Sequence, residues 1–215
     1  MTSRFTTFAI AALAGIALPT AAQAQSIDEG QQRQAVEAWT QCIADENAEE
    51  VHALLVLDYR GAPYRRQLND LADRRVSSAC FNAMPRDYRR IELGGLPFAG
   101  GLAERLIETM GEDSLVLRLS RAVVGAEAET FSYTDEVANC MARGAPNLVA
   151  DLFATEVSEA EETAALDALA PVLTVCSRSG SSIEASPMAM RAMLATASYR
   201  LLAAQVDEPS GNDDA

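Results

Sequence analysis

Lysine is absent from this chain of 215 residues, so all 17 of its basic residues are arginine. The lack of an amine side chain excludes Schiff-base chemistry, the phosphate-binding lysine of Walker A loops and serine–lysine dyads. Against the 17 basic residues stand 31 acidic ones, and the formal net charge is −14. Because neutralisation of phosphates supplies most non-specific affinity for nucleic acid, this charge argues against a nucleic-acid partner.

Histidine is nearly absent as well, since His52 is the only one. It lies in an apolar segment that is predicted to be helical, and a partly buried structural role is the favoured interpretation. No G-x-S-x-G, H-E-x-x-H, G-x-G-x-x-G or EF-hand motif occurs in the sequence. We therefore expect no catalytic residue, no metal and no cofactor, and a non-enzymatic protein is favoured. A pair of carboxylates of the glycosidase type stays open as an alternative, although the many acidic residues do not single one out.

Long apolar runs are missing beyond the N-terminus. The run Phe8–Leu18 follows Arg4 and precedes Ala22-Gln23-Ala24, and it is too short to span a bilayer. These features predict a secretory signal peptide at residues 1–24, and no transmembrane segment is expected after its removal. The expected location is the periplasm, with release outside the cell as the alternative.

Cysteine occurs four times, at positions separated by 38, 60 and 36 residues: Cys42, Cys80, Cys140 and Cys176. This short-long-short spacing suggests a duplication, and the triplet Cys42-Ile43-Ala44 matches Cys140-Met141-Ala142. An exported chain with an even number of cysteines favours disulfides over a zinc site, for which no C-x-x-C is present. If each copy repeats one ancestral bond, the pairs are Cys42–Cys80 and Cys140–Cys176.

The apolar periodicity predicts an all-α fold of two tandem related helical modules, each stapled by one disulfide. We expect the first module at residues 25–125, the second at 126–206 and a disordered acidic tail at 207–215. The expected helices are Ala35–Ala44, Ala48–Leu57, Pro63–Ala79, Ala145–Thr155, Glu159–Val175 and Pro187–Gln205. A linking helix is favoured over a strand at Leu115–Val124.

Three local features qualify these helices. Pro171 should kink or divide the helix Glu159–Val175, whose start resembles a capping box of Ser158 and Glu161. The glycine pairs 94–95 and 100–101 are expected to form a turn before a helix.

One local surplus of positive charge stands out. Residues 60–90 contain eight arginines against three aspartates, whereas residues 158–188 contain one arginine against five acidic residues. This contrast has three interpretations: an exposed helix face with local ion pairs, docking of the two copies through opposite charge, or an anion site. The candidate anion-binding residues are Arg60, Arg65, Arg66, Arg89 and Arg90.

The end of the second copy carries the pattern M-R-x-x-L-A-x-x-x-Y-R, from Met190 to Arg200. Together with Cys140-Met141-Ala142, it resembles uncharacterised exported helical proteins of alphaproteobacteria that contain a duplicated two-cysteine unit. The resemblance implies export and duplication, but no activity, substrate or catalytic residue. We therefore expect a non-catalytic periplasmic binding or interaction protein, with an envelope protein or an anionic envelope component as partner. The alternative is a cell-envelope hydrolase that uses paired carboxylates.

Overall fold

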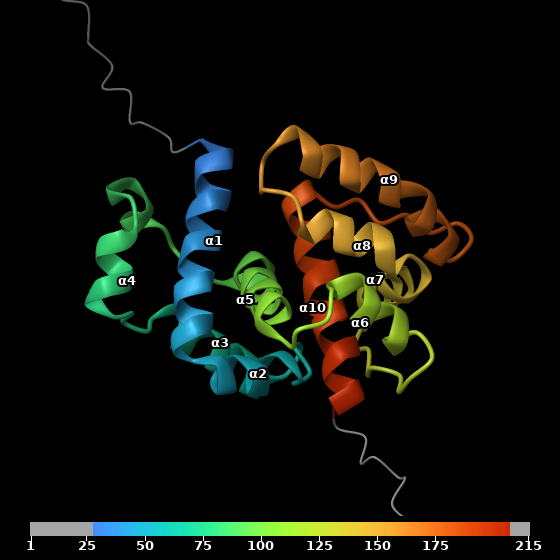
Figure 1. The fold of residues 1–215 in the computed structure, drawn as a ribbon, viewed down its shortest axis with the longest axis horizontal. Coiled ribbons are helices and arrows are strands. Elements are labelled where there is room, and N and C mark those ends of the chain that lie inside the picture. Colours follow the sequence, from blue (N-terminus) through green and yellow to red (C-terminus); the bar gives the residue numbers. More distant parts are fainter. Residues whose placement is uncertain (1–27, 207–215) are drawn as a thin grey trace, which may run out of the picture.

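The computed structural model describes residues 28–206, so the predicted signal peptide and acidic tail lie outside the described residues. Within this range every regular element is a helix, which confirms the all-α prediction (Figure 1). The α-helices are α1 (Glu29–Glu46), α2 (Ala48–Leu55), α3 (Ala62–Ala72), α4 (Ser78–Ala83), α5 (Gly95–Thr109), α6 (Leu115–Ala122), α7 (Tyr133–Gly144), α8 (Pro146–Phe153), α9 (Ala160–Cys176) and α10 (Pro187–Val206), and a 3₁₀ turn, η1, spans Arg86–Arg90.

Helices α5 and α10 cross at the centre of the fold (Figure 1). A Cβ placed on Gly100 would lie 2.4 Å from the Cβ of Ala192, so the crossing depends on the missing side chain. The next residue, Gly101, faces α1, where a Cβ would lie 2.5 Å from Oγ1 of Thr40. The prediction that the second glycine pair belongs to a turn is therefore wrong. Its members lie inside α5 because two neighbouring helices approach closely there.

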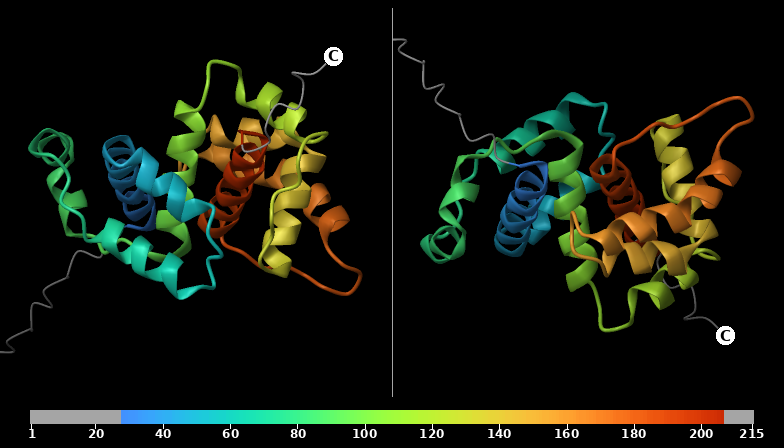
Figure 2. Two further views of the ribbon diagram at one scale, coloured as in Figure 1. Left: turned by 90° about the horizontal axis from the view of Figure 1, so that it is seen from below. Right: turned by 90° about the horizontal axis from the view of Figure 1, so that it is seen from above.

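The other helices are arranged around this central pair. Helix α1 packs on α5, and α7 packs on α10, while α8 and α9 cover the second half (Figures 1 and 2). Helix α4 lies at the outer edge beyond α1, and none of its side chains is buried. One continuous apolar core includes residues of both halves, such as Phe98 of α5 and Leu194 of α10.

The structure corrects the predicted helix Pro63–Ala79. Helix α3 ends at Ala72, and α4 begins only at Ser78. The segment between them is held by other contacts, because Arg74 donates to Asn47 and Glu50, and the Ser77 N–H donates to Glu46. The linking helix expected at Leu115–Val124 is confirmed as α6.

Helix α9 also departs from its expected form, since it runs without a break through Pro171. The proline lies on the exposed side, where solvent can hydrate the carbonyl of Asp167 that loses its N–H partner. The predicted capping box is wrong in its acidic member. Ser158, with a φ of 69°, donates its N–H to Glu162 at 3.0 Å instead of pairing with Glu161.

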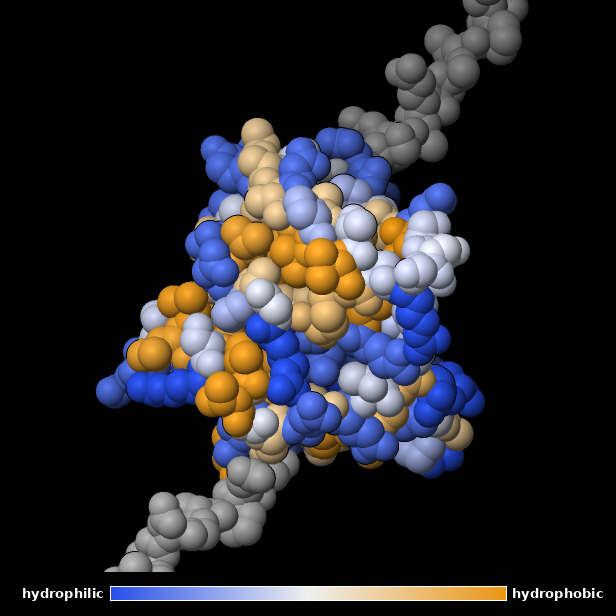
Figure 3. All heavy atoms as spheres, turned by 90° about the vertical axis from the view of Figure 1, so that its right-hand side faces the viewer, coloured by the Kyte–Doolittle hydropathy of each residue, from blue (hydrophilic) through white to orange (hydrophobic). Residues whose placement is uncertain are grey.

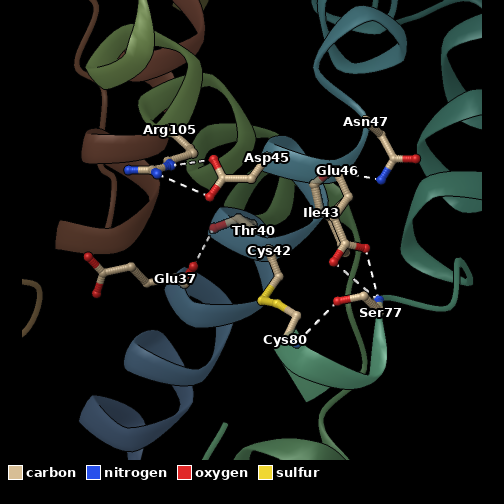
Figure 4. The surroundings of a disulfide bond; sticks show 10 residues. All are labelled: Glu37, Thr40, Cys42, Ile43, Asp45, Glu46, Asn47, Ser77, Cys80 and Arg105. Carbon is tan, nitrogen blue, oxygen red and sulfur yellow. Dashed lines mark hydrogen bonds and ion pairs between the residues drawn. A yellow bond between two sulfur atoms is a disulfide. The ribbon is translucent and has the colours of Figure 1, made fainter. Parts of the chain in front are cut away.

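Two disulfides hold the described chain, and they join the predicted partners. Cys42 of α1 bonds to Cys80 of α4 with a Cα–Cα distance of 6.1 Å, and Cys140 of α7 bonds to Cys176 of α9 with 5.7 Å. Figure 4 shows the first bridge, where Ser77 caps α4 by accepting the N–H of Cys80 at 3.2 Å. Beside it, Arg105 forms a fork to Asp45 at 2.7 and 3.0 Å and ties α5 to α1.

The surface of the second half mixes apolar and charged side chains, with an apolar patch bordered by polar residues (Figure 3). Among residues 28–206, no helix has both the length and the apolar character that crossing a membrane requires.

Candidate functional site

A cavity of about 330 Å³ lies where α3, the start of α5, α7 and α10 meet. Its volume falls within the range of small-molecule sites, which are mostly apolar with a few converging polar groups. The lining combines both kinds of residue: Tyr59, Tyr64, Arg65, Leu68, Gly95, Leu96, Thr134, Asp135, Met193, Thr196 and Arg200. Because α3 and α5 belong to the first half and α7 and α10 to the second, the two halves build this cavity together.

The one acidic group of this lining is neutralised. Asp135 forms an ion pair with Arg200, and their side chains are only 5% and 7% exposed. The second carboxylate oxygen of Asp135 accepts the N–H of Phe131 at 2.9 Å. The guanidinium of Arg200 lies 5.5 Å from the centre of the Phe131 ring and 5.9 Å from that of Tyr59. A guanidinium that lies near two aromatic rings and pairs with a carboxylate adds no net charge to the lining.

The hydroxyl groups on one side of the cavity are already engaged. The Tyr59 hydroxyl donates to Oγ of Ser132, which also interacts with Thr134 at 2.9 Å. Ser132 is the N-cap of α7, because its Oγ accepts the N–H of Asp135 at 3.3 Å. These bonds fix the Tyr59 ring at the start of α7.

Two hydrogen-bond donors on α3, the Tyr64 hydroxyl and the Arg65 guanidinium, have few partners in the protein. Tyr64 is only 9% exposed, and its hydroxyl has no hydrogen-bond partner among residues 28–206. Burial raises the pKa of Tyr64 to about 12, so the hydroxyl stays protonated and can donate at neutral pH. Arg65 donates one N–H to the carbonyl of Arg60 at 2.7 Å, and no carboxylate of the described residues lies within ion-pair distance of it. The hydroxyl of a largely buried tyrosine and an exposed guanidinium without a carboxylate partner therefore line the same cavity.

The five arginines predicted as an anion site have different surroundings. Arg60 is neutralised by Asp58, to which it donates at 2.9 and 3.0 Å. Arg89 lies 4.5 Å above the Phe81 ring and donates to the carbonyl of Met84. Arg65 and Arg66 are both exposed, and the side chain of Arg90 lies outside the described part of the structure. Of the four described side chains, Arg65 is the one that lines the cavity.

Docking of the two copies through the arginine-rich stretch is not what the structure shows. Among residues 28–206, no ion pair joins residues 60–90 to residues 158–188. The stretch instead pairs within its own half, as Arg74 does with Glu50 at 2.5 Å.

The ion pairs that do connect the halves are buried near the α5–α10 crossing. Arg33 of α1 donates to both oxygens of Glu162 of α9, at 2.6 and 2.7 Å. Arg191 of α10 donates to the same carboxylate at 3.2 Å and forms a fork to Glu104 of α5. Arg33, Glu162 and Arg191 are at most 9% exposed. We call these four residues the buried ion network.

Opposing effects set the ionisation of this network. Burial alone would raise the pKa of Glu162, but hydrogen bonds from Arg33 and from the Ser158 N–H outweigh it and lower the pKa. Glu37 lies beside the network without such a partner, and burial and then the charge of Glu104 raise the pKa of Glu37. Glu37 and Glu104 line a second cavity of only about 50 Å³, which has room for a few water molecules.

His52 differs from its predicted surroundings, because the side chain is exposed rather than partly buried. Its Nδ1 lies 2.6 Å from the hydroxyl of Tyr199, so it connects α2 to α10. No group of three or more histidine, cysteine or acidic side chains within residues 28–206 is placed to hold a metal ion.

Sequence reasoning identified Arg65 but missed Arg191 and Arg200, which contribute to the buried ion network and to the cavity. Arg191 and Arg200 are the only charged residues of α10, a helix that is otherwise uncharged and mostly apolar. A lone charge in a buried helix is a signal for a buried partner. Nine residues of α-helix turn the chain by about two and a half turns, so the two arginines point to opposite sides of α10. One reaches the buried ion network, and the other reaches the cavity.

Comparisons with models of protein families, with curated proteins and with solved structures find no match to this chain. Its function must therefore be inferred from the geometry of the site.

Proposed function

We propose that this protein is an exported, non-catalytic binding protein that takes up a small ligand in the cavity between α3, α5, α7 and α10. The observation that carries the proposal is the lining, in which apolar side chains of Leu68, Leu96 and Met193 lie beside two under-used donors, Tyr64 and Arg65. Sites of this composition orient a ligand by a few polar groups and gain most of their affinity from apolar burial.

Export to the periplasm is part of this proposal. It is supported by two disulfides, because such bonds persist in oxidising compartments. Cleavage of the predicted signal peptide would leave a mature chain that begins at Gln25. N-terminal sequencing of the protein from a periplasmic fraction tests this point, and an intact N-terminus in the cytoplasmic fraction would contradict it.

We also propose that the two halves arose by duplication. The order α1–α2–α3–α4–α5 has a counterpart in α7–α8–α9–α10, if α3 and α4 together correspond to α9. In both halves a disulfide links the first α-helix to the last α-helix before the closing one, with η1 between α4 and α5 in the first half. A superposition of the two halves that is no better than that of unrelated helical proteins would contradict common ancestry.

Ligand-observed NMR with a library of small apolar fragments tests binding in the cavity. Met193→Trp adds a bulky ring to the lining and should abolish binding that the native protein shows. Val206→Trp adds the same ring at an exposed position, 73% accessible, and should leave binding unchanged. Absence of binding to the native protein, or equal binding by Met193→Trp, would contradict the proposal.

The hydrolase alternative would use Glu37 and Glu104, whose pKa values are both raised by burial, as a general acid requires. Arg191 is hydrogen-bonded to Glu104, and the adjoining cavity of about 50 Å³ is too small for a sugar ring unless the helices move apart. Release of soluble fragments from peptidoglycan by the native protein, and its loss in Glu37→Gln, would favour this alternative over binding.

A further inference from the structure

The charges along the cavity do not cancel. Asp135 is matched by Arg200 and by the N–H of Phe131, which leaves Arg65 as the unmatched charge of the lining. The surplus is positive in a chain whose net charge is −14. A cationic ligand would find no free carboxylate here, whereas an anion would find a guanidinium with N–H groups to spare.

The Tyr64 hydroxyl is a second hydrogen-bond donor. Tyr64 precedes Arg65 in the sequence and lines the same cavity. The side chain is nine-tenths buried, and without a ligand its hydroxyl has no protein partner in the described range. A tyrosine hydroxyl that lines a cavity and has no protein partner is available to donate to a bound acceptor. Phenol and guanidinium donors together suit the oxygens of a carboxylate or a phosphate.

The rest of the cavity is suited to an apolar group. Leu68 and Leu96 contribute aliphatic side chains, Met193 contributes a flexible thioether, and the rings of Tyr59 and Tyr64 meet edge to face at 6.4 Å between centres. The Thr196 hydroxyl adds little polarity, because it already donates to the carbonyls of its own helix at 3.1 Å. A free inorganic anion would leave this apolar surface unfilled.

We propose, on the basis of the binding function above, that the ligand is an anionic amphiphile: one carboxylate or phosphate group held by Arg65 and Tyr64, with an apolar body between α5 and α10. The shared chemistry covers free aliphatic or aromatic acids and phosphate esters. The structure favours a single anionic group, because the lining offers one unmatched charge.

Isothermal titration with matched eight-carbon probes tests this class. Octanoate and octyl phosphate should bind about tenfold or more tightly than neutral octanamide, because a charge-assisted bond is stronger than a neutral one. Acetate and inorganic phosphate, which lack the body, should not bind measurably. The tighter of the two anionic probes identifies the preferred head group, and either preference supports the class.

Single substitutions then separate the parts of the site. Arg65→Gln should weaken octanoate about tenfold, to the level of octanamide, while leaving octanamide within about twofold. Arg66→Gln removes the neighbouring exposed charge and serves as the matched control, with both affinities unchanged. Tyr64→Phe keeps the ring and should weaken the anionic probes more than octanamide, because a charged acceptor forms the stronger hydrogen bond with the hydroxyl. Circular dichroism and thermal melting of each variant establish that it is folded.

The outcomes distinguish the two levels of the proposal. Equal affinity for octanoate and octanamide, both lost in Met193→Trp, would overturn the anionic ligand class and leave the binding function standing. Unchanged octanoate affinity in a folded Arg65→Gln variant would also overturn the class. No binding of any probe, nor of the apolar fragments above, would overturn the binding function itself.

Discussion

Arg33 of α1 and Glu162 of α9 are 129 residues apart in the chain, yet their side chains form a buried ion pair with two hydrogen bonds. The same carboxylate accepts from Arg191, so one residue of the second half holds a helix of the first. Buried pairs contribute little net stability against apolar replacements, but loss of one partner is costly because the other charge stays buried.

We therefore expect Glu162→Gln to destabilise the protein by about 3 kcal/mol or more, because it leaves the buried guanidinium of Arg33 without a carboxylate, while Arg191 keeps Glu104. Urea denaturation followed by circular dichroism measures the change. Asp113→Asn breaks the exposed pair with Arg121 and should cost no more than about 1 kcal/mol. Equal losses in the two variants would show that the buried ion network has no special role.

The raised pKa of Glu37 predicts that its replacement stabilises the protein, whereas replacement of Glu162 destabilises it. A carboxyl whose pKa is raised on folding contributes stability that is complete below its unfolded pKa and lost as the pH rises through its folded pKa. Glu37→Gln removes that loss, so it should stabilise the protein at pH 7 and not at pH 4. The gain should stay below about 1 kcal/mol, since solvent screens this partly exposed side chain.

Thermal melting at the two pH values measures this difference, with Glu129→Gln in an exposed loop as the control. A gain for Glu37→Gln that is equal at pH 4 and pH 7 would rule out an effect of ionisation.

The α5–α10 crossing predicts a steric effect at Gly100. Gly100→Ala should destabilise by about 1–3 kcal/mol, because its Cβ would overlap the Cβ and Cα of Ala192. Gly144→Ala near the end of α7 is the matched control, since its nearest neighbour is 4.0 Å away. The control should be neutral or slightly stabilising through helix propensity. Similar denaturation midpoints for both variants would contradict the close crossing.

The two disulfides are predicted to differ in effect: loss of one unfolds a single helix, and loss of the other lowers the stability of the whole protein. Helix α4 has no buried side chain, whereas α9 buries Leu169 against the core. The double substitution of Cys42 and Cys80 by alanine should therefore release residues 78–83 for hydrogen exchange while the core stays protected. Replacing Cys140 and Cys176 should instead lower global stability by about 2–4 kcal/mol. If mass spectrometry shows that the amides of α4 stay protected from hydrogen exchange without the Cys42–Cys80 bond, the predicted difference between the two disulfides is wrong.

The elements that could be predicted from the sequence are those encoded locally or by cysteine spacing. Apolar periodicity identified α8, α9 and α10, and the two short cysteine separations identified both disulfides. The break between α3 and α4 depends on contacts of Arg74 and Ser77 with residues some thirty positions earlier, which no local pattern records.

The candidate site was only partly predictable for the same reason. Arg65 could be singled out as one of several arginines, because a charge surplus is visible in the sequence. The Asp135–Arg200 pair depends on how α7 packs against α10, and the burial of Tyr64 depends on how α3 packs in the fold. The cavity forms only through tertiary packing, so the sequence contains its lining residues but does not show that they lie together.

The central claim is that the cavity between α3, α5, α7 and α10 binds a small ligand. The most direct test is a titration of methyl-labelled protein, followed by NMR, with octanoate, with the other eight-carbon probes and with the apolar fragments. We predict saturable shifts at the methyl groups of Met193, Thr134, Leu68 and Leu96, with little change at Val175 on the far end of α9. Shifts confined to other surfaces, or no saturable shift at these methyl groups, would contradict the account.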